Sequence, residues 1–238
     1  MRAVNIVDIF ILLILAVTIL GGWYKGFLST LFSLIATVLA WGIAMLFVSP
    51  VSSVVKSNDS LYQMLLYYTE GSEYVAKTDV ELTRVSVSSV SPDTLEIILD
   101  NADMPLPMAD SVSHNIAVET FAEEGYTTLG DYFNLTIVSV VIHIAVILAL
   151  FLIARLALGF VLGIIEHGRG GFPTLVYADS PIGAGVGLLH GITLISLLFM
   201  LLPIALTVLP RLYEFIEESF FGEFFYRANI FIRLIPAA

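Results

Sequence analysis

The sequence predicts an all-α membrane protein with four transmembrane helices, an acidic, mainly helical lobe between the second and third of them, and an amphipathic C-terminal helix. Two observations predict this fold class. Of the 238 residues, 58% are apolar and 13% are charged, whereas soluble domains carry about 25% charged residues. The chain also has four apolar runs, about residues 4–20, 27–48, 135–154 and 182–209. Each is long enough for a helix to cross a hydrocarbon core of about 30 Å, which takes roughly 20 residues.

The first two runs predict a transmembrane hairpin over residues 1–48. The gap between them contains Lys25, which we interpret as the tip of the hairpin, held at the headgroup layer. A secretory signal peptide is the alternative for the first run, because Arg2 and the apolar residues 9–20 fit its charged and apolar regions. Asp8 interrupts the start of that run, no Ala-x-Ala site follows it and a second apolar run begins at once, so the hairpin is favoured.

Residues 49–133 are polar enough to form an extramembrane lobe, and this lobe carries the charge of the protein. Residues 59–131 include 14 acidic side chains, and three basic residues lie in or just before that span, Lys56, Lys77 and Arg84. The difference equals the whole net charge of −11. Binding to nucleic acid or anionic lipid through net charge is therefore not expected. The chain has no cysteine, which excludes disulfides and thiolate metal sites.

Short helices are predicted within the lobe. Residues 58–71 have cap-type residues, apolar positions at helical spacing and a final glycine, whereas residues 78–90 alternate in part and predict extended chain. A further helix should begin with Ser91 as its cap and Pro92 at its first position, and another near Asp110 or Ser111. The residues expected to face inward are Leu95, Ile98, Leu99, Val112, Ile116 and Phe121.

The third and fourth runs predict a second transmembrane pair, over residues 134–210. The third run stays apolar as far as Ile165 with Arg155 inside it, so its helix must tilt or continue along the interface. We expect Arg155 to snorkel at the far face of the membrane. Residues 211–238 mix phenylalanines with charged side chains and predict an amphipathic interfacial tail.

Three glycines recur at every fourth position of the fourth run, Gly183, Gly187 and Gly191, and form a stripe on one helix face. In lipid, helices associate where small residues let their backbones approach. The stripe therefore predicts a helix-packing surface. It can serve within the monomer or between copies of the chain, and the sequence leaves both alternatives open.

With four crossings, the hairpin tip and the loop between the third and fourth helices share one side of the membrane. This places five charged residues at one interface, Lys25, Arg155, Glu166, Arg169 and Asp179. Our hypothesis is that Lys25 pairs with Asp179. The alternative is that each charge simply meets water and headgroups.

Two histidines in apolar surroundings, His143 and His190, form a candidate polar pathway for protons or ions. The alternative is that they are hydrogen-bonded packing residues. Histidines without carboxylates at ligand spacing do not predict a metal site. No Gly-x-Ser-x-Gly, phosphate-loop or His-Glu-x-x-His motif occurs. We therefore expect no catalytic, cofactor-binding or metal-ligating residues, and no enzyme.

Two segments resemble the colicin V production protein family, CvpA. Residues 5–40 resemble the opening of that family, and ADSPIGAGVGLLHGITLI resembles its second block, although Ser180 stands where the family usually has arginine. Together they cover about 55 residues. The residues that carry the family motif are Asn5, Asp8, Gly21, Lys25, Gly26, Phe27 and Asp179.

The resemblance implies a multi-pass protein of the bacterial inner membrane, with an accessory or scaffold role in toxin production or export and in envelope homeostasis. A small oligomeric channel or transport component, with the glycine stripe at a multi-subunit interface, is the alternative. The expected partners are membrane lipids, other membrane or envelope proteins and, for the channel, further copies of the chain, but no nucleic acid. The positive-inside rule favours a lobe outside the cytoplasm.

Overall fold

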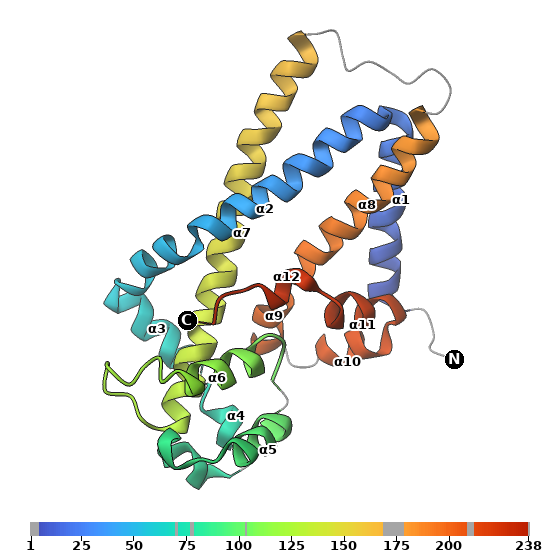
Figure 1. Cartoon of the computed structure of the whole chain (residues 1–238). Helices are drawn as coiled ribbons and strands as arrows, with labels where there is room; N and C mark the ends of the chain where they lie inside the picture. Colours follow the sequence, from blue (N-terminus) through green and yellow to red (C-terminus); the bar gives the residue numbers. More distant parts are fainter. Residues whose placement is uncertain are drawn as a thin grey trace. The chain divides into compact units, whose positions relative to one another are not determined.

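The computed structural model describes the chain in six stretches, residues 5–69, 71–76, 79–102, 104–168, 179–208 and 212–237. Over these stretches the regular structure is helical, apart from one isolated antiparallel bridge between Ser86 and Thr128. Four helical segments are long and apolar enough to cross a membrane, which confirms the predicted fold class. They are α1 (Ile6–Lys25), α2 (Phe27–Lys56), α7 (Leu129–Gly168) and α8 (Asp179–Phe199) with its continuation α9 (Leu202–Val208), as drawn in Figure 1.

The chain divides into two compact units. The first unit comprises Met1–Val48, Val146–Leu202 and Pro210–Phe231. The second unit comprises Ser49–Ala145, Pro203–Leu209 and Ile232–Ala238. The long helices α2 and α7 contribute residues to both units, whereas α1 and α8 belong to the first alone.

In the first unit, α1 packs along α8 through the glycine stripe. A Cβ atom added at Gly183 would meet the carbonyl oxygen of Gly22, and one at Gly187 would meet the carbonyl oxygen of Thr18. At Gly191 the Cβ would meet the hydroxyl of Thr18. Only glycine allows the two backbones to come this close. Within the monomer, the stripe therefore packs α8 closely against α1.

Several helix ends differ from the boundaries predicted from hydropathy, and α7 begins at Leu129, six residues before the predicted apolar run. The helix α2 runs through Pro50 to Lys56, beyond the predicted end of the hairpin. The fourth apolar run is interrupted after Phe199, shortly before Pro203. Proline has no N–H group to bond the carbonyl four positions back, that of Phe199, and its ring clashes with that carbonyl. The N–H groups of residues 200 and 201 instead bond to carbonyls three positions back, at 3.2 and 3.0 Å.

The C-terminal tail forms three short helices rather than one. They are α10 (Leu212–Glu218), α11 (Phe220–Arg227) and α12 (Ile230–Arg233). Ser219 and Asn229 separate them, and the side chain of each accepts a bond from a backbone N–H of the helix that follows, that of Gly222 at 2.7 Å and that of Phe231 at 3.0 Å. Such caps begin new helices. The tail also packs on α1 and α8, where an interfacial helix lying on the bilayer was expected.

The second unit contains the lobe, built from short helices. They are α3 (Asp59–Thr69), α4 (Glu73–Ala76), η1 (Val80–Arg84), η2 (Val87–Ser89), α5 (Pro92–Ala102) and α6 (Met108–Ala117). The two 3₁₀ helices η1 and η2 lie where the partial alternation predicted extended chain, so that prediction is wrong over these residues. Asp79 caps η1 by accepting a bond from the N–H of Glu81 at 3.0 Å, which favours a turn over a strand.

The core of the lobe joins its helices to the first turns of α7. Ile98 and Val112 are buried against Leu129 and Phe133, and Leu95, Leu99 and Ile116 pack around them. A second cluster brings Phe121 to Tyr132 and Leu135, with Tyr62 beside it. These contacts confirm the inward positions expected from helical spacing. Burial, together with the nearby carboxylate of Glu124 and the phenol of Tyr126, raises the pKa of Tyr62 to about 12, so this phenol stays protonated at neutral pH.

Candidate functional site

The first family-motif residues form the start of α1. Asn5 is the N-cap, and its Oδ1 accepts bonds from the N–H groups of Val7 and Asp8 at 2.9 and 3.2 Å. The Oδ2 of Asp8 accepts a bond from the Asn5 N–H at 3.1 Å, which completes a capping box. The Asn5 amide also donates to the carbonyl of Phe215 at 2.6 Å. Asn5 thus joins the beginning of α1 to the tail.

The carboxylate of Asp8 also caps a second helix. Its Oδ1 accepts bonds from the Ser219 hydroxyl at 2.7 Å and the Phe221 N–H at 2.9 Å, at the start of α11. The residue is only 2% exposed. Helix N-termini carry partial positive charge and unpaired N–H groups, so one buried carboxylate stabilises two helix starts at once. Asp8, expected as a residue of the family motif, is therefore the anchor of the C-terminal tail.

The second acidic motif residue, Asp179, also caps another helix. It begins α8, and its Oδ1 accepts a bond from the N–H of Phe27, the first residue of α2, at 3.1 Å. Between α1 and α2, Gly26 has a φ of +82°, and a Cβ there would meet the Asp179 carboxylate. Glycine is thus required both by the turn and by the close approach of the carboxylate.

The predicted ion pair between Lys25 and Asp179 is not among those that the described residues form. Lys25 is exposed, and the carboxylate bonds to the Phe27 N–H instead. The first N–H groups of a helix have no partner within it, and a carboxylate held there satisfies one of them without ordering a long lysine side chain. Lys25 still lies at the reversal between α1 and α2, as predicted. The side chain of Glu166 and all of Arg169 lie outside the described residues.

A substitution at the hairpin tip tests this arrangement. Gly26→Ala should lower the thermal midpoint of the detergent-solubilised protein markedly. Alanine is strained at the positive φ of this position, and its methyl group would displace the Asp179 carboxylate. Gly21→Ala is the matched control, since a Cβ at Gly21 has nothing within 4 Å. Equal midpoints for the two variants would show that Asp179 does not hold the tip in this way.

A polar cluster lies within the spanning helices of the first unit. Arg155 of α7 donates from Nη2 to the Ser33 hydroxyl at 3.0 Å and from Nε to the Thr37 hydroxyl at 3.2 Å, both on α2. The Thr37 hydroxyl shares a further hydrogen bond with Nε2 of His190 on α8, at 3.1 Å. We call these four residues, Ser33, Thr37, Arg155 and His190, the polar cluster.

Arg155 thus turns into the helix bundle, and the expectation that it snorkels at the far face is wrong. Its partners lie six and ten residues after Phe27, which at 1.5 Å per residue is roughly 9–15 Å along α2. Ion pairs in the described part of the chain join Arg227 to Glu217 and Glu223, and none involves Arg155. The polar cluster therefore holds a half-buried cation whose partners are neutral hydroxyl groups.

The two histidines have separate partners. His143, in the second unit, is 2% exposed and shares a hydrogen bond through Nδ1 with the carbonyl of Pro236, at 3.0 Å. His190, in the first unit, bonds to Thr37. No described partner connects them into one pathway. The described residues include no group of three or more histidine, aspartate or glutamate side chains placed to hold a metal ion.

Sequence reasoning missed several residues of these sites. Ser33 and Thr37 are four positions apart and so share a face of α2, a signal that the sequence does contain. The role of Ser219 could be suspected only from its type, since serine favours N-caps. Nothing local to Asp8 indicates that its partner is 211 residues away.

Comparisons with known proteins give one family. The family model described as Colicin V production protein matches residues 7–71. Searches of curated proteins and of solved structures returned no match to this chain. The matched residues include α1, α2 and α3, and Asp179, which lies beyond them, reaches them through its bond to Phe27. The chain is a membrane protein with four candidate spans, and its residues 7–71 are similar to the Colicin V production protein family.

Proposed function

We propose that this protein is a non-enzymatic accessory or scaffold protein of the bacterial inner membrane that supports toxin production or export and, more broadly, envelope homeostasis. The family match supports the link to colicin V production. One observation carries the scaffold role: both acidic motif residues, Asp8 and Asp179, are used to cap helices of this chain. The family motif thus builds a rigid arrangement of helices, and the acidic lobe is the part offered to partners.

The proposal can be tested in a strain that produces colicin V and from which its own family member has been deleted. The wild-type chain should restore toxin in the culture medium. Purified protein in liposomes should at the same time conduct neither chloride nor protons, followed with entrapped fluorescent indicators. Normal membrane levels of the chain without any restoration of secreted toxin would reject the role in toxin export.

We further propose that the lobe lies outside the cytoplasm, where it would meet envelope proteins. The chain has no native cysteine, so single cysteines report cleanly on each side. Ser89→Cys in the lobe should react with a membrane-impermeant maleimide added to intact spheroplasts. Tyr24→Cys, which is exposed at the hairpin tip, should react only after lysis. The reverse pattern would place the lobe inside.

The second candidate function, a channel or transport component, is favoured by the polar cluster alone. The glycine stripe no longer supports it, because Gly187 packs on Thr18 of the same chain. Arg155→Met separates the two functions. In a scaffold it should leave secreted toxin unchanged and keep or raise the thermal midpoint, since replacing a charge inside a protein by an apolar side chain is often neutral or stabilising.

In a transport protein the same Arg155→Met substitution should abolish a flux that the wild type conducts. Lys25→Met is the matched control, because it removes an exposed cation at the hairpin tip and leaves the polar cluster intact. A wild-type flux that is lost in Arg155→Met and kept in Lys25→Met would replace the scaffold proposal by the transport function.

A further inference from the structure

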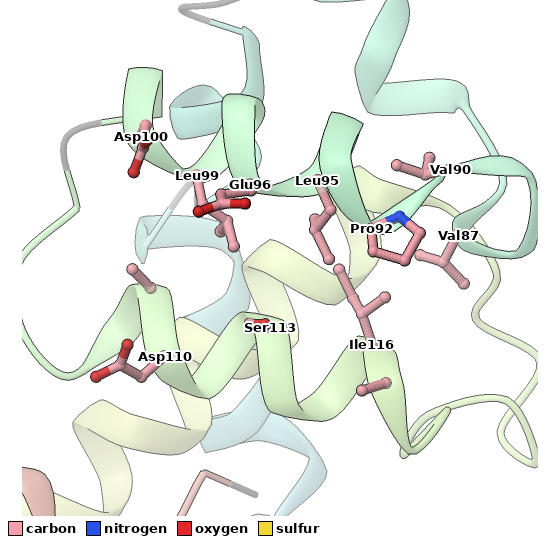
Figure 2. Close-up of a pocket in the computed structure, with 12 residues that line it drawn as sticks. Val87, Val90, Pro92, Leu95, Glu96, Leu99, Asp100, Asp110, Ser113 and Ile116 are labelled. Carbon is pink, nitrogen blue, oxygen red and sulfur yellow. The ribbon is translucent and has the colours of Figure 1, made fainter.

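The lobe contains a groove of about 610 Å³ between η2, α5 and α6. Leu95 of α5 and Ile116 of α6 extend into it from its two sides (Figure 2). Figure 2 also shows Val87, Val90 and Pro92 gathered at one end, and Asp100 and Asp110 at the other. We call this the lobe groove. It has an apolar floor and an acidic end.

The charges that line the lobe groove are all negative. They are the carboxylates of Glu96, Asp100 and Asp110, and no lysine, arginine or histidine is among the lining residues. The ion pairs of the described part of the chain involve none of these three carboxylates. All three side chains are exposed. A cation placed between them would be attracted to each and would reduce their mutual repulsion.

We propose that the lobe groove binds a cationic, amphipathic helical segment of a partner protein. The apolar face of that segment would pack on Leu95, Leu99 and Ile116, and lysine or arginine side chains on the same helix would meet the acidic end. Helix-in-groove binding of this kind uses apolar anchors three, four and seven residues apart. This inference rests on the proposed scaffold function and names the chemistry of the partner.

Charge decides between this occupant and the others. The lobe spans 14 acidic residues against three basic ones, so an anionic peptide would be repelled both by the acidic end and by the surrounding field. A second copy of the chain is a poor occupant, because the whole chain has only ten lysines and arginines against 21 acidic residues. The occupant that fits both the apolar floor and the acidic end is a helix with an apolar face and basic side chains.

The two parts of the lobe groove should contribute differently to binding. Exposed ion pairs each contribute little affinity and are screened by salt, but they steer association and exclude partners of the wrong charge. Buried apolar anchors supply most of the affinity. Binding should therefore weaken as salt rises, without being abolished, and should also weaken when the apolar floor is altered.

The test uses the full-length protein in zwitterionic nanodiscs and a synthetic 18-residue Leu/Lys amphipathic peptide. An environment-sensitive fluorophore on Ser113→Cys, a residue that lines the lobe groove, reports binding, and the same label on Ser57→Cys, outside the groove, is the reference. A Leu/Glu peptide and a scrambled Leu/Lys peptide are the ligand controls. We expect a saturable signal only from the Leu/Lys helix and only at the Ser113 label.

Charge reversal of the three lining carboxylates decides whether the groove is the site. The triple variant Glu96→Lys, Asp100→Lys and Asp110→Lys should lose at least tenfold in affinity for the Leu/Lys peptide. The control triple variant Asp59→Lys, Glu81→Lys and Glu123→Lys changes net charge equally at exposed sites that do not line the groove, and should stay within twofold of the wild type. Glu96→Gln, Asp100→Asn and Asp110→Asn, which preserves side-chain shape, replaces the reversal should that variant fail to fold.

Each other outcome overturns the proposal. Equal losses in the two triple variants would mean that only bulk charge attracts the peptide. A signal from the Leu/Glu peptide, or from unlabelled wild-type protein in place of peptide, would assign the groove to an acidic partner or to a second copy. Absence of peptide binding together with restored toxin secretion by the groove variant would reject the groove but leave the scaffold function standing.

Discussion

Replacing Gly187 by leucine should prevent the folded protein from accumulating in the membrane. The new side chain would begin at a Cβ that meets the backbone carbonyl of Thr18, and backbone cannot rotate away as a side chain can. The helices α1 and α8 would have to separate along their length. Overpacking a tight contact costs about 1–3 kcal/mol and occasionally more, and we expect at least the upper end of that range. Such a loss removes a substantial fraction of a typical stability of about 5–15 kcal/mol.

The matched control for this prediction is on the same helix. Gly185 is exposed, and a Cβ there has nothing within 4 Å, so Gly185→Leu makes the same chemical change without the clash. Fluorescence-detected size exclusion of detergent-solubilised protein should show a monodisperse peak for Gly185→Leu and its near absence for Gly187→Leu. Similar peaks for both variants would mean that α1 and α8 do not pack through the glycine stripe.

Asp8→Ala should release the C-terminal tail from α1. The substitution removes the acceptor of the Ser219 hydroxyl and the Phe221 N–H and opens the capping box of α1. Hydrogen bonds to a charged group contribute about 1.5–3 kcal/mol each, partly recovered by water, so we expect a loss of about 2–4 kcal/mol in the free energy of unfolding. Ser219→Ala should cost less, because the Phe221 N–H keeps its partner.

Trp41 provides the readout for tail release. Its ring meets that of Phe231 edge to face, with centroids 4.9 Å apart. The chain has two tryptophans, so a Trp23→Phe background leaves Trp41 as the single reporter. Asp8→Ala should shift its emission, whereas Glu214→Ala, which removes an exposed carboxylate from α10, should not. An unchanged Trp41 spectrum in Asp8→Ala would show that this carboxylate does not anchor the tail.

Features that depend on composition and on spacing along one helix were predictable without a structure. The four spans follow from apolar runs, and the stripe of Gly183, Gly187 and Gly191 follows from a spacing of four residues. The inward residues of the lobe, such as Ile98 and Val112, follow from the same helical periodicity. These features depend only on the residues of one segment. Its apolar content decides whether the segment enters lipid, and the spacing of its residues decides which of them share a helix face.

Features that depend on a partner distant in the chain were not predictable. The opposite charges of Lys25 and Asp179 predicted an ion pair, but in the structure the Asp179 carboxylate accepts a bond from the N–H of Phe27. Almost every residue has a backbone N–H, so the sequence does not indicate which N–H a carboxylate will bond. The partner is known only when the structure shows which helix start lies next to the carboxylate. The same reason hid the bond from Phe221 to Asp8.

Arg155 shows the same difference between what its own segment predicts and what a distant partner decides. Hydropathy placed it near the end of a long apolar run, and for an isolated helix the membrane surface would be its best environment. In the folded chain the hydroxyls of Ser33 and Thr37 offer it two bonds inside the bundle. The sequence alone therefore determines which segments enter the lipid and which helix faces can pack closely. Only the tertiary structure decides which polar groups meet, because hydrogen bonds act over about 3 Å and require the two helices to be in place.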